Sequence, residues 1–222
     1  MTTFTADEYF QTRLPFDPRR AIVWKEVCRY LRQHDYVPAG GVVVDIGAGY
    51  GEFINHVEAR ERHAVDISGD LAKYFNPDVT LHVHSCVSMP TLRDAHFDVA
   101  FSSNVFEHLT RQELDASLSE IWRILKPGGR LILVQPNFKY CATAYFDDYT
   151  HLQIFTHVSL ADLLASRGFA VVAVEGRFLP LSVKSTRLPV RGAFIRAYLA
   201  SPIRPLAAQM LVVAQKPAAS TR

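Results

Sequence analysis

Apolar runs alternate with amphipathic stretches along most of the 222-residue chain. Short apolar runs bounded by turn residues are typical of buried strands, and amphipathic stretches between them are typical of helices that pack on a sheet. The alternation therefore predicts βαβ units, an α/β fold and a largely parallel sheet. The predicted strands are residues 41–46, 62–66, 79–83, 97–102, 131–135, 169–174 and 210–214.

Four segments with helical periodicity accompany these strands. The predicted helices are residues 18–33, 51–60, 111–125 and 159–167. Asp17 and Pro18 supply a cap and a first-turn residue for the N-terminal helix. The helix over 111–125 has a strong apolar face, and we expect the Lys-Pro-Gly-Gly sequence at 126–129 to end it.

The composition is that of a globular protein, with 49% hydrophobic and 21% charged residues. A chain of this length is one domain by default, so we expect residues 1–222 to form a single unit. No run of 18 apolar residues predicts a membrane-spanning helix, and the polar, acidic N-terminus does not resemble a signal peptide. Cys28, Cys86 and Cys141 lack disulfide or metal spacing, which favours reduced thiols and a cytoplasmic location.

The net charge of +2 conceals an asymmetry. Eight basic residues and no acidic residue follow Glu175, which leaves 16 basic and 22 acidic residues in the range 1–175. Two interpretations stay open, namely attraction to phosphates or anionic surfaces and a solvated face that balances an acidic body. The basic excursion over about 177–205 is compatible with an acceptor-side cap, a peripheral membrane contact, a dimer contact or a plain surface subdomain.

The central motif runs from Val43 to Phe53 and places three glycines directly after a predicted strand. Glycine allows a sharp turn and a close approach of the backbone to a ligand, and a following helix would offer unpaired N–H groups. The spacing is Gly-x-Gly-x-Gly, which differs from the Gly-x-Gly-x-x-Gly of dinucleotide binders. Asp45 suits a ligand with an ammonium group and would repel a pyrophosphate. The alternative is a tight turn without a ligand.

A second acidic residue, Asp66, follows Gly51 by 15 residues at the end of the next predicted strand. A carboxylate at this place can accept hydrogen bonds from both hydroxyls of a ribose. Taken alone, Asp66 is equally compatible with a cap for a helix over 69–75. Together with the glycine turn it favours ribose binding.

Four motifs in this order resemble the class I methyltransferases that depend on S-adenosylmethionine (SAM). They are Val-Asp-Ile-Gly-Ala-Gly-Tyr-Gly at 44–51, Val-Asp-Ile-Ser at 65–68, Phe-Asp-Val-Ala-Phe-Ser-Ser-Asn-Val-Phe-Glu-His-Leu at 97–109 and Ile-Leu-Lys-Pro-Gly-Gly-Arg-Leu at 124–131. The resemblance covers roughly residues 15–178 and the final strand. It implies a Rossmann-like sheet of seven mostly parallel strands, with helices on both faces and an antiparallel last strand.

The resemblance also implies the residues that would bind SAM. In such enzymes the turn packs against the methionine part of SAM, the first acid holds its polar groups, and the second takes the ribose with an apolar neighbour against the adenine. The corresponding residues here are Gly47, Ala48, Gly49, Asp45, Asp66 and Ile67. An arginine of the N-terminal helix clasps the carboxylate of SAM in similar enzymes, which points to Arg20. A solvated arginine at the end of the helix is the alternative.

Two stretches leave the cofactor contacts open. The loop at 84–90 lacks the Asp that usually contacts the adenine amino group, so Ser85 or the backbone of Cys86 would substitute. Ser103 and Asn104 are expected to face the sulfonium end of SAM. Asn104 would otherwise satisfy loop backbone groups.

Two of the nine histidines, His108 and His151, follow predicted strands at the edge where ligands bind in open α/β folds. A histidine with a near-neutral pKa suits removal of a proton from an oxygen nucleophile. Structural roles are the alternatives for both. Some related methyltransferases bind a divalent ion through Glu-x-x-Glu-His, but Asn104 replaces the first carboxylate, so no metal is expected.

The leading hypothesis is therefore an enzyme that transfers a methyl group from SAM to a small-molecule acceptor. A loose resemblance of the 135–155 loop and the basic tail to methyltransferases of surface-polysaccharide pathways favours an oxygen of a sugar, or of a glycan or lipid-linked precursor. A non-catalytic SAM-binding partner subunit and a nicotinamide-dependent dehydrogenase are the alternatives. Nucleic acid is not expected, because the basic tail lacks a clear aromatic stacking pattern.

Overall fold

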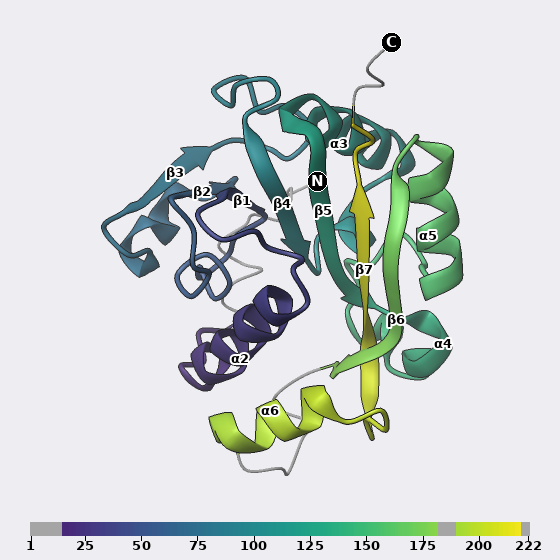
Figure 1. The fold of residues 1–222 in the computed structure, drawn as a ribbon. Coiled ribbons are helices and arrows are strands. Elements are labelled where there is room, and N and C mark those ends of the chain that lie inside the picture. Colours follow the sequence, from purple (N-terminus) through teal and green to yellow (C-terminus); the bar gives the residue numbers. More distant parts are fainter. Residues whose placement is uncertain (1–14, 182–189, 219–222) are drawn as a thin grey trace.

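The computed structural model describes residues 15–181 and 190–218. Within them, seven strands form one sheet in the order β3-β2-β1-β4-β5-β7-β6. The strands are β1 (Val42–Ile46), β2 (Glu61–Asp66), β3 (Val79–Val83), β4 (Phe97–Ser103), β5 (Leu125–Pro136), β6 (Ala170–Pro180) and β7 (Ala207–Gln215). The first five pair in parallel, whereas β7 is antiparallel to β5 and β6. The predicted Rossmann-like sheet with an antiparallel last strand is confirmed (Figure 1).

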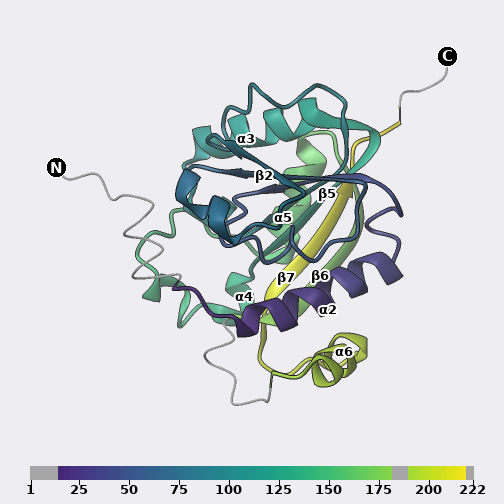
Figure 2. The same ribbon diagram turned by 90° about the vertical axis from the view of Figure 1, so that its left-hand side faces the viewer.

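Helices cover both faces of the sheet (Figures 1 and 2). They are α2 (Arg19–Gln33), α3 (Arg111–Ile124), α4 (Phe138–Cys141), α5 (His157–Ser166) and α6 (Gly192–Ala200), with short 3-10 turns η1 (Gly69–Tyr74), η2 (Phe106–His108) and η3 (Tyr145–Asp147). Apolar residues of α3 and α5 pack on one face of the strands, and those of α2 and α6 pack on the other. The excursion between β6 and β7 contains α6 beside α2, although its residues 182–189 lie outside the described part.

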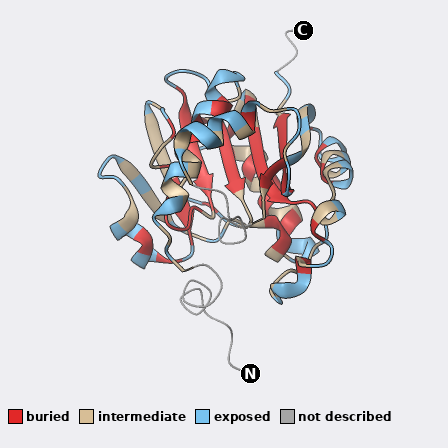
Figure 3. Cartoon of the chain, turned by 90° about the horizontal axis from the view of Figure 1, so that it is seen from below, coloured by how far each residue is buried: buried red, intermediate tan, exposed pale blue. Residues whose placement is uncertain are grey.

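Burial explains why the central strands form. All five residues of β1 are buried, and eight of the nine residues of β7 are buried, as expected for strands covered on both faces. Figure 3 shows the buried residues concentrated in the strands and the exposed residues on the outer helix surfaces. Among the described residues, no helix is both long and apolar enough to cross a membrane.

The helix predicted over 51–60 does not form; a run of turns takes its place. Backbone carbonyls in this segment accept from side chains: Glu52 O from the His56 ring, Ile54 O and Asn55 O from Arg62, and Asn55 O also from Asn76. The helical pattern is reduced to single contacts such as Asn55 N to Gly51 O, 3.0 Å. A regular helix would need these carbonyls for its own ladder.

The helix ends before the Lys-Pro-Gly-Gly sequence, as predicted, but the strand predicted over 131–135 begins earlier than expected. The helix ends at Ile124, and β5 begins at once with Leu125, which pairs with Phe97 of β4. The segment belongs to β5 rather than to a loop, and the register shifts between Phe97 and Val99. Gly128 has φ +82°, which only glycine adopts easily, and this conformation accommodates the shift.

Candidate functional site

The predicted site residues gather at the carboxyl edge of the parallel strands. β1 ends at Ile46, β2 at Asp66 and β4 at Ser103, and their pairing brings these ends side by side. In open α/β sheets, ligands bind outside this edge. A cavity of about 470 Å³ lies at the opposite, amino-terminal edge, where Asp35, Asp98 and Arg130 are among its lining residues, and it includes none of the predicted site residues.

The glycine turn after β1 is held by backbone hydrogen bonds. Gly47 N and Ala48 N donate to the carbonyl of Val65 at 2.8 and 3.1 Å, so the turn is attached to the end of β2. Gly47 has φ +72°, and a Cβ there would lie 2.3 Å from Cγ2 of Val105. The close packing and the positive φ together explain why this position needs glycine.

The carboxylate of Asp66 lies directly against this turn. It is 7% exposed, and its Oδ2 accepts a hydrogen bond from Gly49 N at 2.9 Å while its Oδ1 accepts from Ser68 N at 3.1 Å. Burial raises the pKa of Asp66, and the two N–H groups oppose that rise. The bend and the acid therefore converge, as the sequence predicts.

The neighbourhood of the turn is rich in acids. Asp45 is buried, and its burial, followed by the charges of Glu52 and Asp66, raises its pKa well above the usual range. Arg20 of α2 supplies one counter-charge, with its guanidinium 3.3 Å from Glu52 Oε1. Three carboxylates near one guanidinium suit a ligand with positive groups, such as an ammonium or a sulfonium. Glu52 was not predicted, although it directly follows the last glycine of the motif.

The residues predicted to contact the adenine, Ile67, Cys86 and Ser85, differ in the groups that they present to a ligand. Ile67, next to Asp66, is 62% exposed and presents an apolar side chain on which a flat base can rest. The thiol of Cys86 packs towards α3 and lies beside Ser117, and burial raises its pKa. Only the backbone of Cys86 then remains for a ligand. Ser85 accepts from Val87 N at 3.4 Å within its own loop.

Asn104 has a structural role in this fold. It adopts φ +53°, its Nδ2 donates to Ser103 Oγ at 3.1 Å, and its Oδ1 accepts from Gln209 Nε2 at 3.0 Å. The amide thus connects the end of β4 to β7. Both partners are side chains, whereas the alternative drawn from the sequence was that Asn104 satisfies backbone groups of its loop.

His108 and His151 come together although 42 residues separate them. Their ring centroids are 4.9 Å apart. Nδ1 of His108 lies 2.9 Å from Thr150 Oγ1 and 3.3 Å from Thr150 O. Because a carbonyl oxygen only accepts, and because Thr150 Oγ1 donates its proton to Asp148, Nδ1 of a neutral His108 must carry the hydrogen. Nε2 is then the basic nitrogen of the ring.

Glu107 precedes this pair and is an acid whose carboxylate is buried. Its side chain is 1% exposed, and neither carboxylate oxygen has a hydrogen-bond partner among the described residues. Burial raises its pKa to about 8, and the charge of Asp148 adds to the effect. Its carbonyl accepts from Leu152 N and Gln153 N, which holds the loop of His151 in place. The Glu-His pair after β4 was visible in the sequence, but the burial of Glu107 was not.

Glu107, His108 and His151 could also hold a cation, because one ligand atom of each lies within 4.8 Å of the others. The amide of Asn104, which stands where a further carboxylate would be, is engaged with Gln209 and Ser103.

Comparison with known proteins agrees with this geometry. Residues 44–133 match the family model of a methyltransferase domain. A dimethylglycine N-methyltransferase of Parasynechococcus marenigrum is 33% identical over 46% of this chain and 40% of its own length. A malonyl-[acyl-carrier protein] O-methyltransferase of Methylococcus capsulatus is 29% identical over 64% and 56%. A tRNA (carboxymethyluridine(34)-5-O)-methyltransferase of Arabidopsis thaliana is 28% identical over 53% and 29%. The chain thus spans about half or less of the length of these relatives.

Solved structures share the fold over most of the chain. A SAM-dependent methyltransferase from Archaeoglobus fulgidus superposes with a TM-score of 0.63 at 23% identity, covering 87% of this chain and 94% of the other. A Burkholderia thailandensis 1,6-didemethyltoxoflavin-N1-methyltransferase, solved with S-adenosylhomocysteine, has a TM-score of 0.57 at 19% identity, with 88% and 78% covered.

Proposed function

We propose that this chain is a class I SAM-dependent methyltransferase that transfers the methyl group of SAM to an oxygen atom of a small-molecule acceptor. The family that the four sequence motifs indicate, and SAM as the cofactor of that family, agree with the family match and the fold. The same match speaks against a nicotinamide-dependent dehydrogenase. The observation that carries the proposal is the contact of the Asp66 carboxylate with Gly49 N, 2.9 Å, beside the glycine turn.

The residues around the turn fit SAM in charge and shape. Asp66 would accept the ribose hydroxyls, and exposed Ile67 would support the adenine. The acidic surroundings of Asp45 and Glu52 would hold the ammonium group, and Arg20 would release Glu52 to bind the carboxylate. SAM supplies an activated methyl group, so the protein chiefly has to align the acceptor and exclude water.

His108 is the proposed base. A hydroxyl acceptor must lose its proton during transfer, and Nε2 of His108 can take it while Nδ1–H stays bonded to Thr150. Burial, followed by the charge of His151, lowers the pKa of His108, which keeps the ring neutral at pH 7. The ring of His151 lies beside it, tilted by 59°, and would help to shape the acceptor site.

The acceptor proposed is a hydroxyl of a sugar, or of a glycan or lipid-linked precursor. A fixed histidine base serves a hydroxyl, whereas an uncharged amine needs no base for the attack. Two described arginines of the basic excursion are engaged with acids, because Arg196 pairs with Glu26 at 2.7 Å and Arg204 pairs with Glu175. The guanidinium of Arg177 lies over the ring of Tyr140, 4.0 Å from its centroid, and is a candidate for binding a phosphate of the acceptor.

Calorimetry with S-adenosylhomocysteine tests the cofactor part. Asp66→Ala and Gly49→Arg should each weaken binding at least tenfold, while Asp70→Ala, an acid close in sequence but outside the turn, should bind normally. Unchanged affinity in both variants would remove the assignment. Turnover of labelled SAM on a panel of sugar nucleotides, glycans and lipid-linked sugars tests the acceptor. Binding without turnover on every acceptor would favour a non-catalytic partner subunit.

A tRNA acceptor is a second candidate, because several relatives are tRNA methyltransferases. Bulk tRNA added to the same turnover assay separates the two proposals. Methyl transfer to tRNA would favour a nucleic-acid acceptor, above all if the affinity of the protein for tRNA falls steeply between about 50 and 200 mM salt.

A further inference from the structure

A cluster of histidines lies at the other end of β2 from the candidate site. Glu61 begins this strand and Asp66 ends it, so the two sites are about 16 Å apart along the strand. Glu61 and His63 come from β2, His82 from β3, and His96 from the segment directly before β4. These residues play no part in the proposed methyl transfer.

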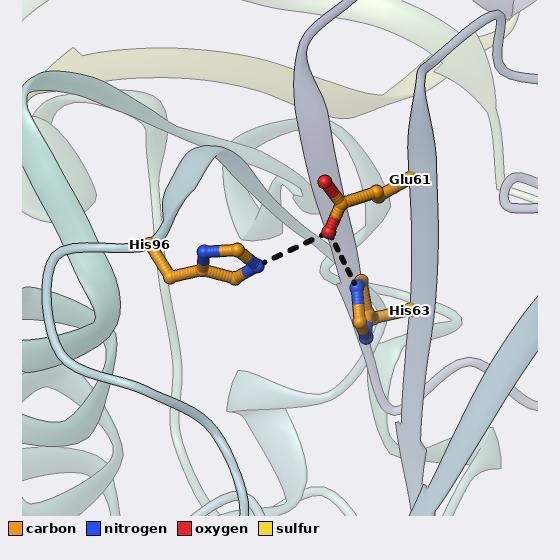
Figure 4. A group of neighbouring side chains, drawn as sticks. All are labelled: Glu61, His63 and His96. Atoms are coloured by element: carbon orange, nitrogen blue, oxygen red, sulfur yellow. Dashed lines mark ion pairs between the residues drawn. The ribbon is translucent and has the colours of Figure 1, made fainter.

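Three of these side chains point at one place (Figure 4). Oε2 of Glu61 lies 3.3 Å from Nε2 of His96 and 3.7 Å from Nε2 of His63, and one ligand atom of each residue lies within 4.8 Å of the others. A tetrahedral ion with ligands at about 2.0–2.1 Å keeps its ligand atoms roughly 3.3 Å apart. The three groups therefore need only small movements to enclose a cation.

A chain of hydrogen bonds behind His63 fixes the orientation of its ring. Nδ1 of His63 lies 3.0 Å from Nε2 of His82, and Nδ1 of His82 lies 2.9 Å from Oγ1 of Thr91. If Nε2 of His63 binds a metal, its Nδ1–H donates to His82, whose own Nδ1–H donates to Thr91. Outer partners of this kind are what metal-binding histidines ordinarily have.

Arg93 is the group that competes with a cation. Its Nη2 lies 3.1 Å from Nε2 of His96, and its side chain is exposed and free to turn away. The guanidinium thus takes the lone pair of His96 that a metal would need. Removing Arg93 should strengthen metal binding, whereas removing a ligand should weaken it.

We propose that Glu61, His63 and His96 form a binding site for a divalent transition metal, with zinc as the probe. Two imidazole nitrogens and one carboxylate oxygen form a ligand set that zinc accepts, with the fourth position left for water. The ion would connect β2 to the segment before β4, where the backbone of His96 already bonds to Ile124 O at 2.8 Å. It would stabilise the amino-terminal edge of the sheet without entering the cofactor site.

The test is a zinc titration of the untagged protein against a chromogenic chelator. His63→Ala and His96→Ala should each bind one zinc ion fewer, or bind zinc at least 100-fold more weakly. His82→Ala should bind zinc about tenfold more weakly or worse. His34→Ala is the matched control and should bind like the wild type. Zinc should raise the melting temperature of the wild type and not that of His63→Ala/His96→Ala.

The second metal-capable group requires its own control. His108→Ala/His151→Ala should keep the zinc equivalent that His63 and His96 provide. The proposal would be overturned if His108→Ala/His151→Ala lost the bound zinc ion and His63→Ala/His96→Ala kept it. It would also be overturned if neither the wild type nor Arg93→Ala bound zinc at about 100 μM. Binding of S-adenosylhomocysteine should be equal in the wild type and in the His63, His82, His96 and Arg93 variants, so the result is independent of the proposed methyl transfer.

Discussion

The two halves of the candidate site are built differently, although they share one edge of the sheet. On the cofactor side, the turn at Gly47–Gly49 and the acid Asp66 are joined by backbone N–H groups across two neighbouring strands. On the acceptor side, His108 and His151 meet through side chains and a loop more than 40 residues away. Backbone geometry fixes the first half, and tertiary packing of side chains fixes the second.

This difference predicts how each half responds to mutation. A change on the cofactor side should alter binding or stability through steric effects on the backbone. A change on the acceptor side should alter rate and pH dependence, because it acts on protonation states. Four variants test this contrast.

The largest effect is expected for His108→Gln. Loss of the base should lower kcat about 10²- to 10⁴-fold, with binding of S-adenosylhomocysteine unchanged. The measurement is single-turnover methyl transfer to whichever acceptor the panel identifies, with His34→Gln as the control. A kcat within twofold of the wild type would remove His108 from the chemistry.

Glu107→Gln should change how stability depends on pH. The folded pKa of about 8 lies above the ordinary value of 4.5, so the folded state keeps a proton that the unfolded state has lost between these pH values. Stability should therefore fall as pH rises from 4.5 to 8, and the glutamine variant should not show this fall. At pH 8 the variant should be more stable by about 4 kcal/mol, and at pH 4.5 nearly equal to the wild type.

Urea unfolding at several pH values measures this difference. Glu58→Gln changes a side chain that is 72% exposed; it is the control and should keep the wild-type fall in stability, because Glu107 is intact. If the free energy of unfolding depended on pH in the same way in the wild type and in Glu107→Gln, Glu107 would be ionised in the folded protein and the expectation would fail.

Gly47→Ala tests the cofactor side by steric means. The added Cβ would lie 2.3 Å from Val105 and would hold a residue at φ +72°, so a loss of about 2–3 kcal/mol in stability is expected. Val105→Ala should relieve the contact but not the backbone strain, so the double variant should recover part of the loss. Full stability in the single variant would contradict the described turn.

The smallest effect is expected for Thr150→Val. The valine side chain cannot accept from Nδ1 of His108 and leaves only the longer contact to the backbone carbonyl, 3.3 Å, so the other tautomer becomes more populated and kcat should fall about tenfold. Thr150→Ser should restore the rate, because its hydroxyl can make the same bonds. The pH–rate profile gives a further readout: the rate should fall below the lowered pKa of His108, and the position of that fall should move in Thr150→Val but not in Thr150→Ser.

Much of the cofactor side could be predicted because its signals are local. The buried run at 42–46, the positive-φ glycines and Asp66 at a strand end are each readable within a few residues. The prediction of a helix over 51–60 was wrong, and the reason cannot be read from the local sequence pattern. Arg62 and Asn76 take carbonyls of this segment, and their approach depends on how β2 and the loop after η1 pack.

The sequence by itself therefore determined the seven strands in their order along the chain, three of the helices, the glycine turn with its two acids, and the resemblance to a methyltransferase family. Backbone propensity and hydrophobic period carry that information, since both act between residues close in the chain. Only the tertiary structure decided the tautomer of His108, the burial of Glu107 and the meeting of Glu61 with His63 and His96. Each of these depends on the distance between side chains on separate elements, which is set by how the elements pack.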